Sequence, residues 1–242
     1  MGNCVSEVSG ENRDLQHIGL FGGTFNPIHT GHILIANEIR EHFSLDSIIF
    51  IPAGAPPHKD RKEVIEPVHR LRMVELAIAK YKYFSVSSIE VFRDGFSYSI
   101  DTVSALQNEL GDSSELYFIT GLDAFLEIRT WKDADKLLTL CSFVVIQRPG
   151  HRFAELKGID LPAMHKISAS DLESLDRGEL QRLSIPMTER YSLFLERITP
   201  CVISSTELRR LIRAGKEVKN LLPENVMSYI IENGLYHEKN NL

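Results

Sequence analysis

Cysteine and long apolar runs are scarce in this sequence. Its 242 residues include only three cysteines, Cys4, Cys141 and Cys201, which lie far apart and form no CxxC pair. This small, odd number excludes a disulfide framework and is typical of the reducing cytoplasm, where we expect the protein. No apolar run approaches the ~18 residues that a membrane-spanning helix needs, so we expect no membrane partner.

Basic residues are also fewer than acidic ones. The chain has 27 Lys and Arg residues against 33 Asp and Glu residues, which gives a net charge of −6. A general nucleic-acid binder usually carries a basic surface, so we expect no nucleic-acid partner. A small phosphorylated ligand remains compatible with this charge, because only the residues around it decide how it binds.

The apolar segments that are present alternate between strand-like and helix-like patterns. Buried strands are expected at 18–21, 47–51, 84–91, 115–120 and 142–146. Helices are expected at 33–43, at 67–80, through Leu110 after a loop at 95–102, and in 222–236 with an end near 233–234. This alternation predicts an α/β fold, a Rossmann-like doubly wound parallel sheet covered by helices on both faces. The last helix would form a C-terminal helical part.

Two segments fall outside this alternation. Residues 1–16 are polar and predict a flexible N-terminal extension, which leaves 17–242 as a single domain. Residues 151–197 mix polar stretches with apolar islands. We interpret 151–197 as a variable excursion of that domain, formed by a small helix pair or an interface, and assign no function to it.

The most informative stretch runs from Gly19 to His32, between the first predicted strand and the first predicted helix. Gly22 and Gly23 allow close contact between a ligand and the main chain, and the helix N-terminus that follows favours an anion. His29 and His32 would lie one turn apart at that helix start, suited to charge developing on a phosphoryl group. A plain tight turn also fits the glycines, whereas a metal pair lacks a neighbouring Cys or carboxylate ligand.

A second window, from Ile203 to Arg210, places serine and threonine directly before an apolar-periodic run. This order predicts a helix N-terminus, whose free N–H groups and hydroxyls can hold a phosphate. Arg209 adds a planar donor of several hydrogen bonds. Taken by itself, this window also fits an ordinary capped helix.

The two windows together resemble a known superfamily. Gly22-Gly23-Thr24-Phe25-Asn26-Pro27-Ile28-His29-Thr30-Gly31-His32 resembles the GxFxPxHxGH signature of nucleotidyltransferases, in the version typical of bacterial nicotinate-nucleotide adenylyltransferases. Ile203-Ser204-Ser205-Thr206 with Arg209 resembles their second hallmark, and the resemblance covers about 17–150 and 198–236. It implies the nucleotidyltransferase type of fold. The family usually has Asp where this chain has Asn26, and this difference is unexplained by the sequence.

The resemblance implies an enzyme of NAD biosynthesis that transfers the adenylyl group of ATP to nicotinate mononucleotide, giving nicotinate adenine dinucleotide and pyrophosphate. The catalytic residues would be His29, His32 and Arg209. ATP would be bound by Gly22, Gly23, Thr24, Phe25, His29, His32, Gly121, Asp123, Ile203, Ser204, Ser205, Thr206 and Arg209. The mononucleotide would be bound by Lys59, Tyr98, Ser99, Trp131, Lys132 and Arg148. Mg²⁺ would arrive with ATP, and no dedicated metal site is predicted.

Several of these residues have simpler interpretations, and other functions stay open. Ser99 and Asp101 fit helix capping, and the single tryptophan, Trp131, fits a core position. A pantetheine-phosphate adenylyltransferase or a cytidylyltransferase would lack the Pro-Pro-His-Lys, Trp-Lys and Arg-Pro-Gly segments present here. Preference for nicotinamide mononucleotide, a non-catalytic nucleotide sensor and a homo-oligomeric state all remain open.

Overall fold

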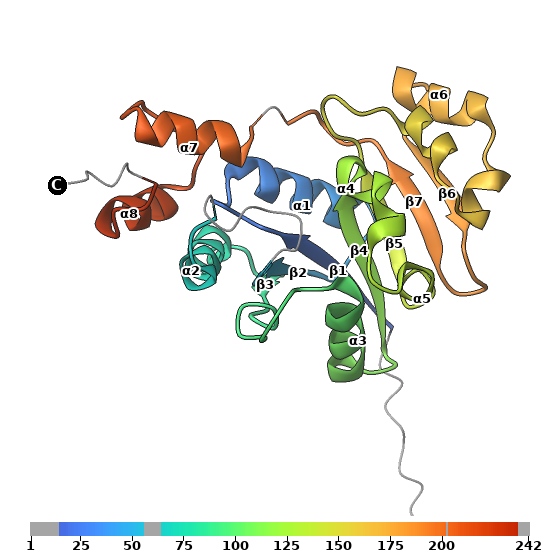
Figure 1. The fold of residues 1–242 in the computed structure, drawn as a ribbon, viewed down its shortest axis with the longest axis horizontal. Helices are drawn as coiled ribbons and strands as arrows, with labels where there is room; N and C mark the ends of the chain where they lie inside the picture. The colour runs from blue at the N-terminus through green and yellow to red at the C-terminus, as the bar shows by residue number, and fades with distance from the viewer. Residues whose placement is uncertain (1–14, 56–63, 202, 237–242) are drawn as a thin grey trace, which may run out of the picture.

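A seven-stranded sheet runs through the molecule in the order β3-β2-β1-β4-β5-β7-β6 (Figure 1). The computed structural model describes residues 15–55, 64–201 and 203–236. The strands are β1 (Gln16–Gly23), β2 (Ser47–Pro52), β3 (Phe84–Val86), β4 (Ser114–Gly121), β5 (Ser142–Ile146), β6 (Arg182–Pro186) and β7 (Ser192–Glu196). Neighbouring strands pair in parallel, and only the edge pair β6–β7 is antiparallel.

Helices cover both faces of the sheet, as expected for parallel strands whose two faces are apolar. One face carries α1 (Thr30–His42), α2 (Pro67–Ile78), α7 (Ser205–Arg213) and α8 (Glu224–Glu232). The other carries α3 (Ser99–Leu110), α4 (Leu122–Leu126), α5 (Ala134–Leu137) and α6 (Ala169–Arg177), with the short 3-10 turns η1 (Ile128–Thr130), η2 (Phe153–Gly158) and η3 (Pro162–Lys166).

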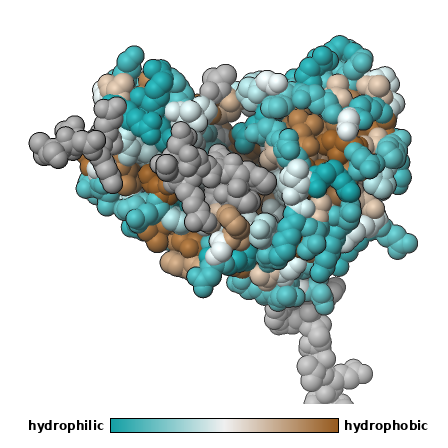
Figure 2. All heavy atoms as spheres, viewed as in Figure 1, coloured by the Kyte–Doolittle hydropathy of each residue, from teal (hydrophilic) through white to brown (hydrophobic). Residues whose placement is uncertain are grey.

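Alternate residues of each central strand enter opposite cores. Phe118 of β4 belongs to the cluster under α3 to α6, whereas Ile119 belongs to the cluster under α1, α2, α7 and α8. Phe143 and Val144 of β5 divide in the same way. Most of the surface on the side seen in Figure 2 is hydrophilic, with apolar side chains gathered beside α4 and around α2. Within the described residues, no helix is long and apolar enough to span a bilayer.

The predicted fold class is confirmed, and the five predicted strands and the long helices are present. Two boundaries were wrong. The third strand ends at Val86 and not near Val91, because Val91 N–H already closes a turn onto the Ser88 carbonyl. The third helix begins at Ser99, inside the predicted loop 95–102. The closing helix covers Glu224–Glu232, after Pro223 at its N-cap, and ends near Asn233 as predicted. The N-terminal extension lies almost wholly outside the described residues, and β1 already includes Gln16.

The excursion at 151–197 is not the small helix pair that was one of its two interpretations, and the other, an interface, stays a prediction. It contributes α6 but also two strands, and β7 extends the parallel sheet beside β5. β7 ends at Glu196, whose side chain is fully buried in the structure. In the sequence a glutamate indicates an exposed position, so the pattern did not indicate a buried strand here. The Glu196 carboxylate accepts from Arg182 Nε at 2.5 Å and pairs with His42 Nδ1 at 2.7 Å. This pairing ties the excursion to the end of α1.

Candidate active site

A cleft of about 480 Å³ opens at the carboxyl end of β1, where the chain order of the sheet reverses between β1 and β4. Ligands of open α/β sheets bind at such a switch point. Both sequence windows meet here, although about 170 residues separate them. The lining residues are Phe21, Gly22, Gly23, Thr24, Phe25, Asn26, His29, His32, Val64, Arg148, Ile203, Ser204, Ser205, Thr206 and Arg209.

The two glycines of the first window have different physical roles. A Cβ atom on Gly23 would lie 2.9 Å from the ring of Phe25, so a side chain here would force that ring to shift. Phe25, with a φ of +47°, folds its ring back over the turn and meets the edge of His32 at a centroid distance of 5.0 Å. A Cβ atom on Gly22 would meet nothing within 4 Å. The backbone at Gly22 is therefore open to a ligand in the cleft.

The two histidines lie at the start of α1, as predicted. His29 is the N-cap residue and His32 lies in the first turn, with ring centroids stacked 3.7 Å apart. The backbone N–H of His29 donates to Nδ1 of His32 at 3.2 Å. Since Nδ1 is thereby an acceptor, the proton of a neutral His32 ring sits on Nε2. His32 can then donate a hydrogen bond through Nε2 to an incoming oxygen.

Burial and positive charge hold both histidines neutral. Burial, with a smaller contribution from Arg148, lowers the pKa of His29 from 6.5 to about 4. Burial, His29 and Arg148, in that order, hold the pKa of His32 well below its usual value. A negatively charged ligand would offset the effect of Arg148 and favour protonation of both rings. The pair is therefore suited to respond to a phosphate.

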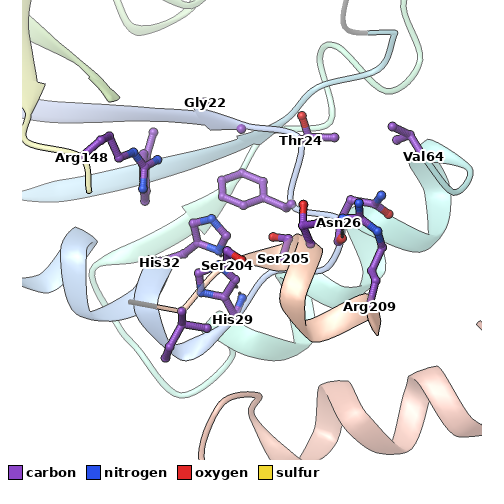
Figure 3. A pocket seen from close by; sticks show the side chains of 15 residues that line it. Gly22, Thr24, Asn26, His29, His32, Val64, Arg148, Ser204, Ser205 and Arg209 are labelled. Carbon is purple, nitrogen blue, oxygen red and sulfur yellow. Dashed lines mark hydrogen bonds between the residues drawn. The ribbon is translucent and has the colours of Figure 1, made fainter. Parts of the chain in front are cut away.

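The second window is bound directly to the first. Ser204 caps α7 by accepting the N–H of Glu207 at 3.2 Å. Ser205 Oγ donates to the carbonyl of Pro27 at 2.9 Å, and Arg209 Nη1 donates to the carbonyl of Asn26 at 3.0 Å. These bonds bring the N-terminus of α7 against the loop before α1, so that Ser204, Ser205 and Arg209 face the same space as the histidines (Figure 3).

The cleft presents donors and cations to its interior. Arg148 and Arg209 lie at its opposite ends, and no Asp or Glu among the described residues lines it (Figure 3). Nε of each arginine and Nδ1 of His29 are buried without a hydrogen-bond partner in the part of the chain that the structure describes. Buried donors without partners are costly unless a ligand satisfies them. The arrangement therefore favours a polyanion.

The remaining predicted ATP residues adjoin the cleft through Arg148. Asp123 Oδ1 lies 3.6 Å from Arg148 Nε. A Cβ atom on Gly121 would lie 2.3 Å from that same carboxylate oxygen and 2.5 Å from Arg148 Nε. Gly121 and Asp123 thus border the cleft, although they are not among the residues that line it. Arg148 was expected beside the mononucleotide phosphate, and the structure places it next to the histidines.

Four of the predicted mononucleotide residues form a separate group at the start of α3. Ser99 is the first residue of α3, directly after Tyr98. Lys132 Nζ lies 4.9 Å from the centroid of the Tyr98 ring and 3.0 Å from Asp101 Oδ2. Trp131 packs partly buried against Phe118, with ring centroids 6.0 Å apart. Lys59, the other predicted residue of this set, lies outside the described residues.

The sequence interpretation missed residues that support the site from behind. Arg70 is fully buried in α2 and donates from Nε, Nη1 and Nη2 to the carbonyls of Ile65, Thr24 and Gly54 at 2.8–3.0 Å. An arginine on the apolar face of a helix, three and four residues before Met73 and Val74, was the available signal. Val64 lines the cleft, and Tyr236 binds Asn26, which lines it. No motif marks either residue.

No group of three His, Cys, Asp or Glu side chains that could hold a metal ion occurs among residues 15–55, 64–201 and 203–236. The cleft offers hydroxyl, imidazole, guanidinium and backbone N–H groups. These are ligands for phosphate oxygens and not the oxygen set that Mg²⁺ prefers.

Comparisons with known proteins agree with this geometry. A family model described as cytidylyltransferase-like matches residues 20–211. A protein of Moorella thermoacetica named "Probable nicotinate-nucleotide adenylyltransferase" is 40% identical over 222 residues, 92% of each chain. A protein of the same name from Thermoanaerobacter sp. is 41% identical over 90% of this chain and 93% of its own.

Solved structures give the same fold. The nicotinic acid mononucleotide adenylyltransferase of Plasmodium falciparum, complexed with NaAD, superposes with a TM-score of 0.65 at 21% identity, covering 91% of this chain and 97% of its own. The same enzyme complexed with APC gives a TM-score of 0.63 at 20% identity. With the two curated relatives, these matches confirm the resemblance that the two windows predicted. The chain belongs to the nicotinate-nucleotide adenylyltransferase family of cytidylyltransferase-like proteins.

Proposed function

We propose that this protein transfers the adenylyl group of ATP to nicotinate mononucleotide and releases pyrophosphate. The observation that carries this proposal is the meeting of both motifs in one cleft that no described carboxylate lines. Three buried nitrogen atoms there, Arg148 Nε, Arg209 Nε and His29 Nδ1, have no hydrogen-bond partner among the described residues. A triphosphate supplies oxygens for all of them. The family relatives carry the name of this activity, which supports the same assignment.

In the proposed reaction, a 5′-phosphate oxygen of the mononucleotide attacks the α-phosphorus of ATP. The bond between the α-phosphorus and the oxygen that joins it to the β-phosphorus breaks, and the electron pair leaves with pyrophosphate. No covalent enzyme intermediate is required, so the protein acts by positioning and by stabilising charge. We assign the Nε2–H of His32 to an α-phosphoryl oxygen, because its Nδ1 is already occupied by the His29 N–H.

The remaining cleft residues then divide by position. His29 contacts the triphosphate beside His32. The N-terminus of α7, with Ser204, Ser205, Thr206 and Arg209, holds the β- and γ-phosphates. Gly121 and Asp123 border the adenosine. Mg²⁺ enters on the phosphates of ATP.

The group at the start of α3 is proposed to hold the mononucleotide. The indole of Trp131 offers a face or edge to an electron-poor pyridine ring. The first backbone N–H groups of α3, near Ser99, and the ammonium group of Lys132 can attract the nicotinate carboxylate. Tyr98 would complete this pocket, and Lys59 and Arg148 are proposed to approach the 5′-phosphate.

The decisive experiment offers ATP and Mg²⁺ with nicotinate mononucleotide, nicotinamide mononucleotide or phosphopantetheine in parallel, and measures pyrophosphate. We expect release with nicotinate mononucleotide to exceed the other two by at least tenfold. His32→Ala should lower kcat by about a hundredfold with little change in thermal stability, a loss typical of one transition-state donor. Equal rates with nicotinamide mononucleotide would overturn the choice of substrate, and release with none of the three would overturn the proposed activity.

A further inference from the structure

Residues 233–236, directly after α8, turn back toward the molecule and bury a tyrosine. Residues 233–236 form a turn after Glu232, in which Gly234 and Tyr236 have φ values of +60° and +66°. The left-handed conformation is unfavourable for a residue with a side chain and persists only where the surroundings fix it. Tyr236 is only 7% exposed and packs in the core cluster beneath α1, α2 and α7.

The hydroxyl of this tyrosine reaches the catalytic loop. Tyr236 Oη donates to Asn26 Oδ1 at 2.9 Å in a buried hydrogen bond between residues 210 positions apart. The same oxygen accepts the N–H of Ile65 at 3.4 Å. Asn26 is 4% exposed and lines the cleft. Two donors from distant segments therefore fix the orientation of the Asn26 side chain.

Asn26 passes this constraint to the second motif. Its backbone carbonyl accepts Arg209 Nη1 at 3.0 Å, while Nε of Arg209 has no partner among the described residues. One end of the Arg209 guanidinium is thus anchored on the loop, and the rest faces the space assigned to the phosphates. Rotation or displacement of Asn26 would move this anchor. Asn26 is therefore the link between Tyr236 and the cation of the cleft.

We propose that Tyr236 is a positioning residue for ATP: through Asn26 it fixes the anchor on which Arg209 is held toward the triphosphate. The inference rests on the proposed function for the identity of the ligand. Tyr236 does not line the cleft, so its effect is transmitted and not direct. Burial raises the pKa of Tyr236 above its usual value, so its hydroxyl keeps the donated proton over the whole range in which the protein is assayed.

The chain provides a matched control in the same C-terminal element. Tyr229 of α8 is partly buried, and its hydroxyl pairs with Nδ1 of His69 in α2 at 2.9 Å. Tyr229→Phe and Tyr236→Phe each remove one hydroxyl and one hydrogen bond of the same length. Only Tyr236→Phe removes a bond to a residue that lines the cleft, and the melting curves measure how far each change loosens the C-terminal part.

The test measures equilibrium binding of an ATP analogue with a non-cleavable α–β bridge, by calorimetry, to the full-length wild type and both variants, with a melting curve for each. A lost hydrogen bond that orients a charged ligand donor is worth about tenfold in affinity. We expect Tyr236→Phe to weaken analogue binding five- to twentyfold and Tyr229→Phe to change it less than twofold. Binding of nicotinate mononucleotide should stay within twofold in both variants.

The outcomes separate this inference from the proposed function. Equal analogue binding by the wild type and Tyr236→Phe would overturn the inference, as would an equal loss in both variants, which would indicate a general structural effect. If the wild type binds the analogue but transfers nothing to nicotinate mononucleotide, the proposed function fails while the comparison of variants still decides the role of Tyr236. A wild type that binds no analogue would overturn both.

Discussion

Acidification from pH 7 to pH 5 should destabilise this protein through His29, by an amount that follows from the burial of its ring. His29 is 4% exposed, and burial, aided by Arg148, lowers its pKa to about 4 in the folded state, against 6.5 when unfolded. As the pH falls below 6.5, the unfolded chain therefore takes up a proton that the folded chain does not. Stability present above pH 6.5 is lost progressively toward pH 4.

For one histidine with these two values, the free energy of unfolding falls by about 2 kcal/mol between pH 7 and pH 5. His32 adds to the effect in the same direction, because its pKa is also lowered by burial. Other groups titrate over this range as well, so the wild type must be compared with His29→Gln. Glutamine cannot be protonated, and the loss on acidification should be about 2 kcal/mol smaller in the variant.

The assay is urea unfolding of both proteins at pH 7 and pH 5, followed by circular dichroism at constant ionic strength. The quantity of interest is the difference between the two pH-dependent losses, in which the contributions of groups that His29 does not influence cancel. Removal of His29 also removes its part in lowering the pKa of His32, which adds to the difference in the same direction. A wild type and a His29→Gln variant that lose the same free energy would refute the reasoning, since His29 would then titrate alike in the folded and unfolded chain. A larger loss in the variant would refute its sign.

Substitutions at three positions test the support of the cleft. Gly31→Ala should lower kcat at least tenfold in steady-state kinetics, because the new Cβ would lie 2.4 Å from Cys201 Sγ and 3.0 Å from His29 Nδ1. Adding Cys201→Ala should restore part of the lost activity. Asn26→Asp should keep ATP turnover within about threefold of the wild type, because the side chain at position 26 still accepts from Ile65 and Tyr236. Asn26→Leu, which has no acceptor, should lower turnover more than tenfold and cost about 2 kcal/mol of stability in urea unfolding. Arg70→Lys should cost about 3 kcal/mol in the same assay, because an ammonium cannot reach three carbonyls.

Each of these substitutions has a result that would contradict the structure. Full activity in Gly31→Ala would mean that a Cβ at position 31 fits beside Cys201 without displacing His29. Comparable damage from Asn26→Asp and Asn26→Leu would mean that the charge at this position matters more than its acceptor oxygen. Normal stability of Arg70→Lys would mean that the three carbonyl bonds of Arg70 contribute little.

The parts of the fold that could be predicted from the sequence are those with a pattern confined to neighbouring residues. The strand before Gly22, the helix after His29 and the capped helix after Ser204 each have a local pattern, and each is present. Their meeting in one cleft followed from the rule that parallel strands end at one edge of a sheet, together with the family resemblance. The roles assigned to the residues themselves remain predictions.

The parts that sequence missed depend on partners far along the chain. β7 was not recognised, because its buried Glu196 is made acceptable only by His42 and Arg182, 154 and 14 residues away. The bond between Asn26 and Tyr236 spans 210 residues and has no local pattern. Arg70 is an exception, since a charged residue on an apolar helix face was visible and was not used.

Asn26 now has a physical explanation that the sequence could not supply. Its backbone carbonyl holds Arg209, and an aspartate at this position would offer the same backbone oxygen. Its side-chain oxygen accepts from Ile65 and Tyr236, and an aspartate oxygen would accept from both equally well. An aspartate would, however, place a negative charge beside Arg209 and offset part of the attraction for a polyanion. A neutral acceptor keeps the loop in place and leaves the charge of Arg209 to the ligand, so asparagine is compatible with a working cleft.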